Sequence, residues 1–564
     1  MAEAALRIVT VSDFNLANLN AYLAHDEQEP RVEAVETPFG NVHQLLMDPG
    51  AACWAEPADA VLLWTRPQAV VPLFGRVLDG EAVSHDDVLA EVASFAALLA
   101  RLGDRAPTVL VPSWTMPPGH RGLGMLDLRP GVGVAHLLAR MNLALAEALA
   151  AVPGFFLLDA DRWLRDATRP YLPKSWYMGK FAFGNDVFQD AVADVKAALR
   201  GLRGQARKLV IVDLDETMWG GIVGEVGWEG LVLGGHDPEG EALVDFQEAL
   251  KGLTNRGVAL GIVSKNEESV ALEAIDKHPE MRLRRDDFAG WRINWRDKAA
   301  NVAELAKEVN LGLQSVVFLD DNPVERARVR EALPEVLVPE WPADKTQYRK
   351  ALLALRCFDL PALSDEDRQR VRMYAQDRRR KDTLTDMQSL DEWLHSLGMQ
   401  ITVAPLDASN LARAAQLLNK TNQMNLATRR MTEKEFAAWA AADGHWVWTF
   451  RVADKFGDQG LTGIVSLARE DDRGCIADFL LSCRVMGRRV EEAMIAVAFD
   501  RARREGLREV VARFEPTAKN KPCLRWWEES AFAKDDGDAH VFRLPTETDY
   551  PVPAHIELRT PEHA

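Results

Sequence analysis

Short apolar runs rich in β-branched residues alternate with helix-like periodicity over the first 190 residues. The runs read LRIVTVS, AVLLW, TVLVPSW and GFFLLDA, and helical periodicity covers residues 84–102 and 135–152. Strands that alternate with helices in this order are typical of an α/β domain with a parallel sheet. We therefore predict an α/β domain over residues 1–190. An amphipathic helix over residues 186–202 is expected to lead into the next strand.

The most informative apolar run is LVIV at residues 209–212, which predicts a buried parallel strand. Two carboxylates, Asp213 and Asp215, follow at its carboxyl end, where open α/β sheets place their ligands. If the chain stays extended through Leu214, both side chains leave the same side of the pleat. Because two crowded acids repel each other, the site is expected to bind a hard cation with oxygen ligands, such as Mg²⁺.

Two further apolar runs also end in polar side chains. The run LGIV ends at Ser264, and the run VVFL ends at the paired acids Asp320 and Asp321. Lys298 lies between them, in INWRDKAANV. This order of a DxDxT pattern, a hydroxyl, a lysine and paired acids resembles the motifs of the haloacid dehalogenase (HAD) phosphotransferases.

The resemblance to HAD phosphotransferases implies a role for each of these side chains. Asp213 would attack phosphorus and form an aspartyl-phosphate. Asp215 would protonate the leaving oxygen and then activate water. Ser264 and Lys298 would hold the oxygens of the transferring phosphoryl group. The implied Mg²⁺ ligands are Asp213, Asp215 through its backbone carbonyl, Asp320 and, in an assisting role, Asp321.

The predicted HAD-like unit spans residues 205–340 and has a Rossmann-like core. The segment 219–241 is too short to hold an extra domain, so we expect a minimal cap and an open site. An open site favours bulky or macromolecular substrates, or a neighbouring domain as the lid. Thr217 is expected to support its loop rather than to react. Residues 341–397 are charged and helical, which is typical of a connector.

From residue 398 to the end the pattern changes to that of an α+β domain. Strand-like runs (MQITVAPL, WVWTFRV, GLTGIVSLARE, CIADFLLS and EVVARF) surround helix-like stretches that include residues 488–504. Over residues 399–532 this order resembles the GNAT acyltransferase fold. The loop after CIADFLLS reads CRVMGRR, and backbone amides at the start of the following helix are suited to bind a phosphate.

This loop supplies the predicted binding residues for a pantetheine arm or its carrier protein, which are Arg484, Gly487 and Arg488. Arg489 stands where the GNAT loop usually has a small residue. That departure argues against an ordinary pyrophosphate site for acetyl-CoA. A phosphopantetheine arm presents a single phosphate and remains compatible with the loop.

The two domains together resemble the FkbH-like, or HAD-IIIC, proteins. The resembling stretches are DLDETMWGGIVGE, FLDDNPVER, LLNKTNQMNLATRRMT, KFGDQGLTGIVSL, DFLLSCRVMGRRVEEAMI and FEPTAKN. The resemblance implies a phosphorylated, 1,3-bisphosphoglycerate-like substrate that loses phosphate. The glyceryl group would then pass as a thioester to an acyl carrier protein, in polyketide or related biosynthesis.

Cys483 is the candidate acyl carrier of the enzyme. It lies at a strand end beside Arg484 and a helix start, where positive potential lowers a thiol pKa. The alternative is a small buried strand residue, since free cysteines are commonly buried; Cys523 is assigned to packing. The polar run at residues 422–429 either contacts the substrate or the carrier protein, or it is a loop whose polar groups hydrogen-bond one another. Its candidate residues are Asn422, Gln423, Asn425, Thr428 and Arg429.

The N-terminal domain resembles the SGNH-hydrolase-like domain that precedes HAD-IIIC units. Ser12 follows a strand, as an SGNH nucleophile would, but there is no GDS motif, and the segment DRWL at residues 161–164 lacks the histidine of a DxxH motif. We therefore expect a non-catalytic domain. The aromatic residues Trp64 and Trp114 belong either to a docking surface or to the core.

The composition of the chain limits which partners, metal sites and cell compartments are expected. The chain has 564 residues and a net charge of −18, which argues against a nucleic-acid or anionic-membrane partner. Five scattered cysteines form no disulfide framework or zinc spacing. No signal peptide or membrane-spanning stretch is apparent, so we expect a cytoplasmic protein. Two alternatives stay open: a stand-alone phosphatase acting on a small metabolite, and a scaffold that docks carrier proteins.

Overall fold

The computed structural model describes residues 5–362, 373–374, 376, 378, 380, 389–421, 424–517, 520–535 and 537–560, without the side chains of Leu390, Lys420 and Cys483. The chain divides into two compact units. The first is Met1–Lys208 with Gln347–Ser364, and the second is Leu209–Thr346 with Asp365–Ala564. Among the described residues, no helix is both long and apolar enough to cross a membrane.

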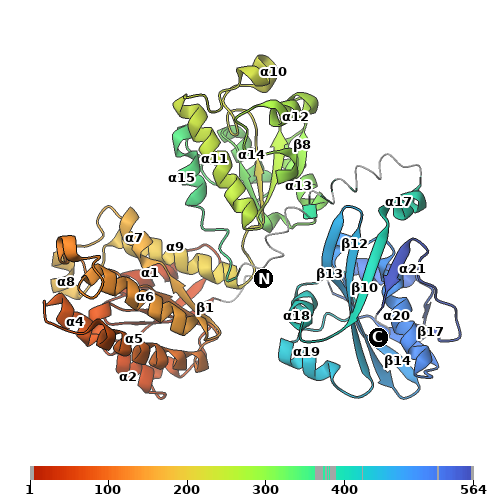
Figure 1. Ribbon diagram of the computed structural model, residues 1–564, viewed down its shortest axis with the longest axis horizontal. Coiled ribbons are helices and arrows are strands. Elements are labelled where there is room, and N and C mark those ends of the chain that lie inside the picture. The colour runs from red at the N-terminus through yellow and green to blue at the C-terminus, as the bar shows by residue number, and fades with distance from the viewer. Residues whose placement is uncertain are drawn as a thin grey trace. The chain divides into compact units, whose positions relative to one another are not determined.

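The first unit is a parallel five-stranded sheet with helices on both faces (Figure 1). Its strand order is β2-β1-β3-β4-β5. The strands are β1 (Leu6–Ser12), β2 (Val32–Glu36), β3 (Ala60–Trp64), β4 (Val109–Pro112) and β5 (Phe155–Leu158). Val9 and Val11 pack in one core layer with α5 (His85–Leu99) and α6 (Val134–Ala150). Ile8 packs in the other layer with α1 (Ala17–His25). The predicted α/β class is confirmed.

The helix expected over residues 186–202 is α9 (Asn185–Leu202), and it lies wholly within the first unit. Val187, Phe188 and Val195 on its apolar face join the core against the sheet. The first unit therefore extends to Lys208, past the predicted boundary at residue 190. A boundary at 190 would cut through an 18-residue helix whose buried stripe needs the sheet to cover it.

The connector expected over residues 341–397 is divided between the two units. Residues 341–346 belong to the second unit, whereas residues 347–364, which include α15 (Tyr348–Leu353), belong to the first. Arg356 fixes this part to α9, because its guanidinium donates to Asp194 at 2.6 Å and to Asp190 at 2.8 Å. Further along, the described residues include α17 (Leu390–Leu397), which leads into the C-terminal domain.

The middle domain begins the second unit and contains a parallel four-stranded sheet in the order β8-β7-β6-β9. Its strands are β6 (Leu209–Val212), β7 (Ala259–Ser264), β8 (Phe288–Ile293) and β9 (Val316–Leu319). The helices are α10 (Val223–Val226), α11 (Pro238–Asn255), α12 (Glu268–Lys277), α13 (Lys298–Glu308) and α14 (Pro323–Ala332). In the register of the sheet, Val212 pairs with Ile262 on one side and with Leu319 on the other. The residues that follow these strands therefore meet at one edge.

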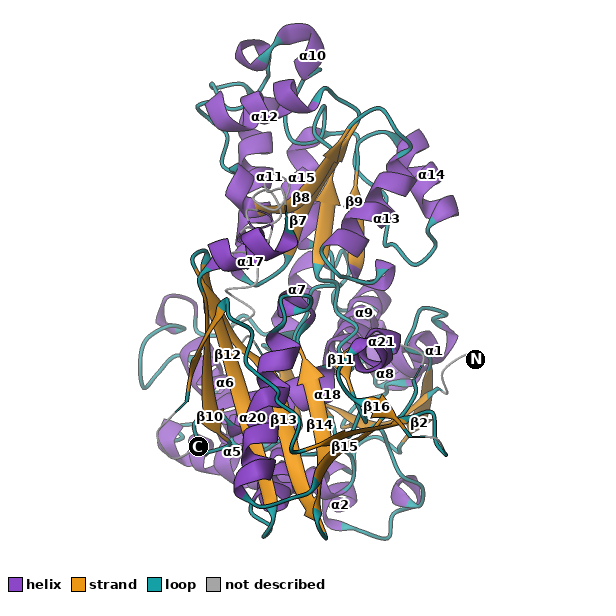
Figure 2. Ribbon diagram, turned by 90° about the vertical axis from the view of Figure 1, so that its right-hand side faces the viewer, coloured by secondary structure: helices purple, strands orange, loops and turns teal. Residues whose placement is uncertain are grey.

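The C-terminal domain is built on a larger, mostly antiparallel sheet, β16-β17-β15-β14-β13-β12-β10-β18 (Figure 2). The strands are β10 (Met399–Pro405), β11 (Met424–Asn425), β12 (His445–Asp454), β13 (Gly457–Glu470), β14 (Arg473–Leu481), β15 (Glu509–Arg513), β16 (Ala533–Lys534), β17 (Val541–Pro545) and β18 (Ile556–Arg559). The helices are α18 (Leu411–Lys420), α19 (Glu433–Ala440), α20 (Val490–Arg504) and α21 (Lys521–Glu529). All five strand-like runs of the sequence form strands here.

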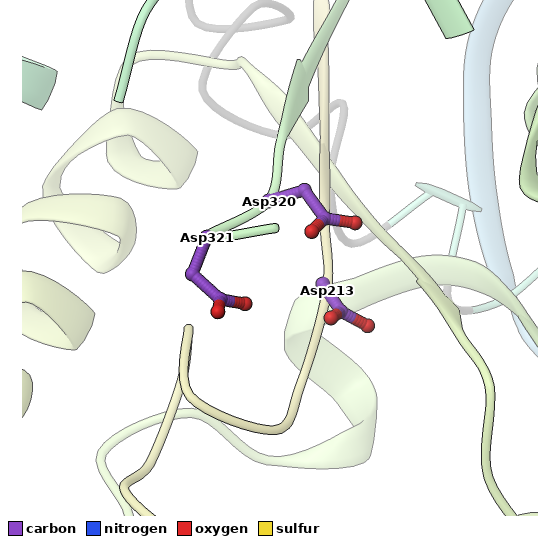
Figure 3. Close-up of side chains that lie close together, drawn as sticks. All are labelled: Asp213, Asp320 and Asp321. Atoms are coloured by element: carbon purple, nitrogen blue, oxygen red, sulfur yellow. The ribbon is translucent and has the colours of Figure 1, made fainter. Parts of the chain in front are cut away.

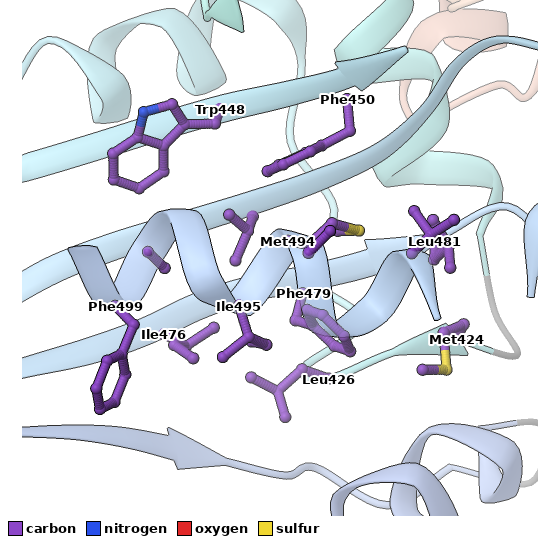
Figure 4. Close-up of a cluster of buried hydrophobic side chains, with 14 of the residues drawn as sticks. Met424, Leu426, Trp448, Phe450, Ile476, Phe479, Leu481, Met494, Ile495 and Phe499 are labelled. Carbon is purple, nitrogen blue, oxygen red and sulfur yellow. The ribbon is translucent and has the colours of Figure 1, made fainter. Parts of the chain in front are cut away.

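Two central strands of this sheet separate. β14 and β15 are parallel and pair only from Arg473↔Glu509 to Ile476↔Ala512. The far end of β14 pairs instead with the short strand β11, through Leu480 and Leu481. α20 packs across the sheet, and its Met494, Ile495 and Phe499 lie in one apolar cluster with Ile476 and Phe479 (Figure 4). In the chain, α20 follows β14 and the CRVMGRR loop, which is the order on which the GNAT resemblance rests.

Candidate functional site

Three carboxylates gather where the strands of the middle sheet end. Asp213 follows β6, while Asp320 and Asp321 follow β9, and the side chains lie close together (Figure 3). One oxygen of each lies within 4.8 Å of the others. Asp213 is 7% exposed and Asp320 is fully buried. Burying charged carboxylates side by side is costly unless they are paired or bind a cation, so the cluster marks a site.

Lys298 completes the charge cluster from a third element. It is the first residue of α13, and its side chain is 3% exposed. Its ammonium nitrogen Nζ lies 2.6 Å from Asp320 Oδ2 and 3.0 Å from Asp213 Oδ2. Ser264, at the end of β7, is 1% exposed, and its hydroxyl lowers the pKa of Asp213. The structure thus brings together both predicted phosphate-binding residues and three of the four predicted metal ligands, of which Asp213 is also the predicted nucleophile.

Burial controls the electrostatics of this cluster. It raises the pKa of Asp213 to about 6, against the lowering effect of Lys298 and with a further increase from Asp320. Burial also raises the pKa of Asp320 and of Asp321, although Lys298 opposes both shifts. The two acids in turn raise the pKa of Lys298 against its own desolvation. One ammonium beside three carboxylates leaves an excess of negative charge.

The donor set suits a hard divalent cation. Carboxylate oxygens are the ligands that Mg²⁺ prefers in proteins. Asp213 Oδ1 is a buried oxygen with no hydrogen-bond partner among the described residues. A buried acceptor left without a donor is a place where a cation or a substrate atom restores the lost interaction. Asp213, Asp320 and Asp321 could together hold such an ion.

The carboxylate of Asp215 is not part of this cluster. Its Oδ1 accepts from Trp219 Nε1 at 2.8 Å and from the Val223 amide at 3.1 Å, and its Oδ2 accepts from Asn266 Nδ2 at 3.0 Å. These three hydrogen bonds fix the direction of the Asp215 carboxylate. The Asp215 side chain is therefore not among the clustered candidate ligands. The predicted role of its backbone carbonyl as a metal ligand stays a prediction.

Two of the residues around Asp215 carry no signal in the sequence analysis. Asn266 is 4% exposed and also donates to Ser264 Oγ at 3.2 Å, so it links the second strand end to the acid. Trp219 is fully buried and directs its ring nitrogen at Asp215. Their closeness in sequence to Ser264 and Asp215 is the only clue that could have identified them.

Thr217 supports the acidic loop, as expected. Its hydroxyl donates to Asp321 Oδ1 at 3.0 Å, and the Asp321 amide donates back to the same hydroxyl at 3.1 Å. Arg326 of α14 donates to the backbone carbonyls of Asp320 and Asp321, at 2.9 and 2.7 Å. These bonds hold the loop after β9 in place, and among them only the bond from Thr217 uses a carboxylate oxygen, Asp321 Oδ1.

The predicted minimal cap matches what is seen between β6 and α11. Gly220 and Val232 form an antiparallel bridge, and the four-residue helix α10 lies between them. Trp295 and Val324 follow β8 and β9 at the same edge of the sheet and are 73% and 72% exposed.

The predicted pantetheine-binding residues of the C-terminal domain point in different directions. Gly487 lines a pocket at the start of α20. The guanidinium of Arg488 is buried, donates to the Arg484 carbonyl at 2.6 Å and lies 3.5 Å from Asp454 Oδ2. Arg484 donates to Ser482 Oγ at 3.1 Å. Neither arginine lines the pocket that Gly487 borders.

The polar run after α18 is largely engaged with its own domain. Asn425 accepts from the Thr428 amide and donates to the Thr421 carbonyl, at 2.9 and 3.0 Å. Arg429 pairs with Asp478, with its Nε 2.9 Å from Oδ1. This geometry favours the self-satisfied loop over a substrate contact for Asn425 and Arg429, whereas the buried Thr428 hydroxyl has no hydrogen-bond partner among the described residues. The two remaining candidates, Asn422 and Gln423, lie outside the described residues.

The structure describes the side chain of Cys523 but not that of Cys483. The side chain of Cys483 lies outside what the structure describes, and its backbone begins a short 3-10 turn (Cys483–Val485) directly after β14. Cys523 is fully buried, and burial raises its thiol pKa to about 12. That shift makes Cys523 a poor nucleophile, as expected for a packing residue.

The N-terminal unit shows a structural use for its candidate serine. Ser12 is 3% exposed and its hydroxyl accepts from the Phe14 amide at 3.0 Å. The adjacent Asp13 pairs with Arg66, whose Nε lies 2.7 Å from Asp13 Oδ2. Trp64 and Trp114 are 1% and 2% exposed, so they belong to the core rather than to a docking surface.

No protein-family model matches the sequence, and no curated protein matches it. Solved structures do match. The N-terminal part of the protein BF1531 from Bacteroides fragilis, which contains a phosphatase domain and was crystallised with Mg, is 26% identical to this chain. The match covers 64% of this chain and 95% of that one, with a TM-score of 0.58. The likeness supports an HAD-like phosphatase fold for the middle domain.

Acetyltransferase structures align with about a quarter of the chain. The ribosomal-protein-S18-alanine N-acetyltransferase from Escherichia coli is 12% identical over 26% of this chain and 94% of that one, with a TM-score of 0.20. The GNAT domain of S. lividans PAT is 17% identical over 25% of this chain and 88% of that one, with a TM-score of 0.21. TM-scores this low do not establish a shared fold. The GNAT-like character of the C-terminal domain rests on the strand order of its own sheet.

Proposed function

We propose that the protein is a Mg²⁺-dependent phosphatase and acyltransferase. The middle domain removes phosphate from a phosphorylated glycerate of the 1,3-bisphosphoglycerate type. The glyceryl group then passes as a thioester to the phosphopantetheine arm of an acyl carrier protein. The observation that carries the phosphatase half is the buried cluster of Asp213, Asp320 and Asp321 with Lys298 at one sheet edge.

The residues of the middle domain divide the phosphoryl step between them. Asp213 Oδ1, which has no partner among the described residues, is the oxygen that attacks phosphorus. Lys298 and Ser264 hold the phosphoryl oxygens, and Asp215 gives a proton to the leaving oxygen. When bound, Mg²⁺ would neutralise the charge of the carboxylates and the phosphate. Most of the rate in such a site comes from positioning and charge neutralisation.

The release of phosphoryl-aspartate uses the same acid in reverse. Asp215 has lost its proton to the leaving group and can take one from water, which then attacks phosphorus. Its three donors, Trp219, Val223 and Asn266, keep the carboxylate directed at the same place for both half-reactions. The shared geometry requires no movement between the two steps.

Two features support the acyl-transfer half. The GNAT-like domain is fused to the phosphatase domain in one chain, and a pocket opens beside the loop where such domains bind a pantetheine arm. The resemblance to FkbH-like proteins names glycerate and the carrier protein. An acyl phosphate is already an activated acyl donor, and a thiol is a suitable attacker.

The test is to incubate the full chain with 1,3-bisphosphoglycerate and Mg²⁺ and to measure phosphate release and intact mass. The native protein should release both phosphates for each glyceryl group that it or a carrier protein gains. Asp213→Asn should release only the acyl phosphate and leave a phosphorylated glyceryl adduct. Asp276→Asn, an exposed acid of α12 paired with Arg285, is the matched control and should behave as native.

Each other outcome assigns a different function. Phosphate release without any acyl adduct or loaded carrier would support a stand-alone phosphatase, the activity that the Bacteroides fragilis structure suggests. No adduct from Asp213→Asn, with substrate still bound, would show that one coupled site performs both steps. Absence of any turnover by the native protein would leave the carrier-docking scaffold.

A further inference from the structure

A pocket of about 250 Å³ lies in the C-terminal domain between the start of α20 and α21. It occupies the region where β15 has separated from β14 and β11 has taken its place. The lining residues are Met424, Met486, Gly487, Arg489, Glu491, Glu492, Pro522, Arg525, Trp526 and Glu529. The lining is thus partly apolar and includes more acids than bases, which is unusual for a site that binds phosphate groups.

In the loop before α20, the Gly487 amide is already bonded within the chain. Gly487 and Arg489 both adopt positive φ, at 73° and 61°, and turn the chain into the helix. In that turn the Gly487 amide donates to Glu491 Oε1 at 3.1 Å. A carboxylate of the chain therefore occupies the position at the helix start that an anion would otherwise take.

Glu491 keeps one oxygen for the pocket. The residue is 3% exposed, it lines the pocket, and its Oε2 has no hydrogen-bond partner among the described residues. Leaving a buried carboxylate oxygen without a donor is costly, and the cost is tolerated most often where a ligand supplies the donor. The geometry points to a proton donor on the ligand side.

The charges around Glu491 set its protonation near neutral pH. Burial raises its pKa to about 7, the Gly487 amide and Arg488 lower it, and Glu492 raises it further. From α21, the neutral thiol of Cys523 faces it, and Arg525 and Glu529 line the same pocket with opposite charges. A carboxylate in this state can accept a proton at neutral pH and return it.

We propose that Glu491 is a catalytic residue that accepts the proton of the thiol receiving the acyl group in this pocket. This inference rests on the proposed acyl-transfer function. The S–H proton moves to Glu491 Oε2, and the sulfur attacks the carbonyl carbon of a glyceryl thioester, the form in which the protein has first taken the group from the acyl phosphate. A new C–S bond forms, the old C–S bond breaks, and the departing thiolate takes the proton back. No other reactant is needed.

A base is useful here because a thiol is mostly protonated at neutral pH. With a thiol pKa of about 8.5, only a few per cent is thiolate at pH 7. Met424, Met486 and Trp526 provide an apolar wall for the uncharged part of a pantetheine arm. The same pocket offers no anion site beyond Arg489 and Arg525, which fits the thiol end of the arm better than its phosphate.

The test is thioester exchange between glyceryl-N-acetylcysteamine and pantetheine, catalysed by the full chain across pH 6–9.5. The native rate should rise through about pH 7 and then level. Glu491→Gln should lose about 10- to 30-fold at pH 7, and the loss should disappear above the thiol pKa of about 8.5, where pantetheine is ionised without help. Asp500→Asn, an exposed acid on the same helix, is the matched control.

The outcomes separate this inference from the function on which it rests. A loss that is equal at every pH would mean that Glu491 only shapes the loop, and a native profile in Glu491→Gln would also overturn the inference. Faster transfer to a primary amine than to pantetheine would make the acceptor an amine. No exchange by the native protein would overturn the acyl-transfer function itself. Hydrolysis of phosphate esters at Asp213 should be unchanged in Glu491→Gln and serves as the internal check of folding.

Discussion

Two regions of the protein bury acidic side chains, and they do so by different means. At the carboxyl edge of the middle sheet, Asp213 and Asp320 face an ammonium within 3.0 Å and form a cluster with Asp321. At the start of α20, Glu491 faces a single backbone amide. The first site has an excess of charge that a cation can satisfy, whereas the second has one free oxygen that a proton can satisfy.

The comparison shows how parallel strands and loops differ in assembling sites. Residues more than a hundred positions apart meet at the middle sheet because neighbouring parallel strands end at the same edge. Arg488 and Arg489 are adjacent in the loop, yet Arg489 lines the pocket and Arg488 turns to buried Asp454. Sequence order is therefore a safer guide to the first kind of site than to the second.

The largest effect is expected from removing the nucleophile of the first region. Asp213→Asn keeps the shape of the side chain but cannot form an aspartyl-phosphate, so phosphate-ester hydrolysis should fall by a factor on the order of 10³ or more. Phosphate release at saturating Mg²⁺ measures it, with Asp276→Asn as the control. Chelation should abolish the native rate. Hydrolysis near the native rate in the Asn variant would mean that Asp213 is not the nucleophile, and the first region would then no longer differ from the second in this role.

The second effect tests whether the first region depends on its internal cation. Lys298→Met leaves Asp213 and Asp320 without their buried counter-charge, which should lower the free energy of unfolding by about 3 kcal/mol. Added Mg²⁺ should restore more stability to this variant than to the native protein, because it replaces the missing positive charge. Thermal unfolding with and without Mg²⁺ measures both. An equal response of the two proteins would mean that no cation binds beside Lys298.

The difference between sites at strand ends and sites in loops also explains how much of the structure the sequence predicts. The structure brings Asp213, Ser264 and Asp320 to strand ends, with Lys298 at the start of α13, because β-branched runs and parallel pairing determine where the strands end. Asn266 and Trp219 were missed, since their role depends on side-chain direction at the end of a strand and in a turn. The boundary at residue 190 was too early because the burial of α9 depends on a partner sheet.

The third effect concerns how the stability of the protein and its affinity for Mg²⁺ depend on pH. Without metal, folded Asp213 keeps its proton up to about pH 6, whereas its ordinary pKa is 3.8, so the folded state binds more protons between these values. Stability should therefore fall as pH rises through this window. Mg²⁺ requires the ionised carboxylates, so its affinity should rise over the same range. Calorimetric titration at pH 5, 6 and 7 measures it, and a pH-independent affinity would contradict the buried cluster.

The smallest effect concerns the direction of Asp215. Asn266→Ala removes one of its three donors and leaves Trp219 and the Val223 amide in place. We expect kcat for ester hydrolysis to fall about tenfold while KM changes little, because the lost contact orients a proton donor rather than binding substrate. Steady-state kinetics measure both constants. A change confined to KM would place Asn266 in substrate binding instead.

The most direct measurement is to locate the phosphoryl group during turnover. The full chain is mixed with a phosphate-labelled substrate and Mg²⁺, quenched in acid within milliseconds and digested, and the labelled peptide is identified by mass spectrometry. Labelling of the peptide that contains Asp213, with none in Asp213→Asn, is the predicted result. Turnover with no labelled peptide, or with the label on a residue outside the Asp213–Asp320–Asp321 cluster, would contradict the assignment of Asp213 as the nucleophile.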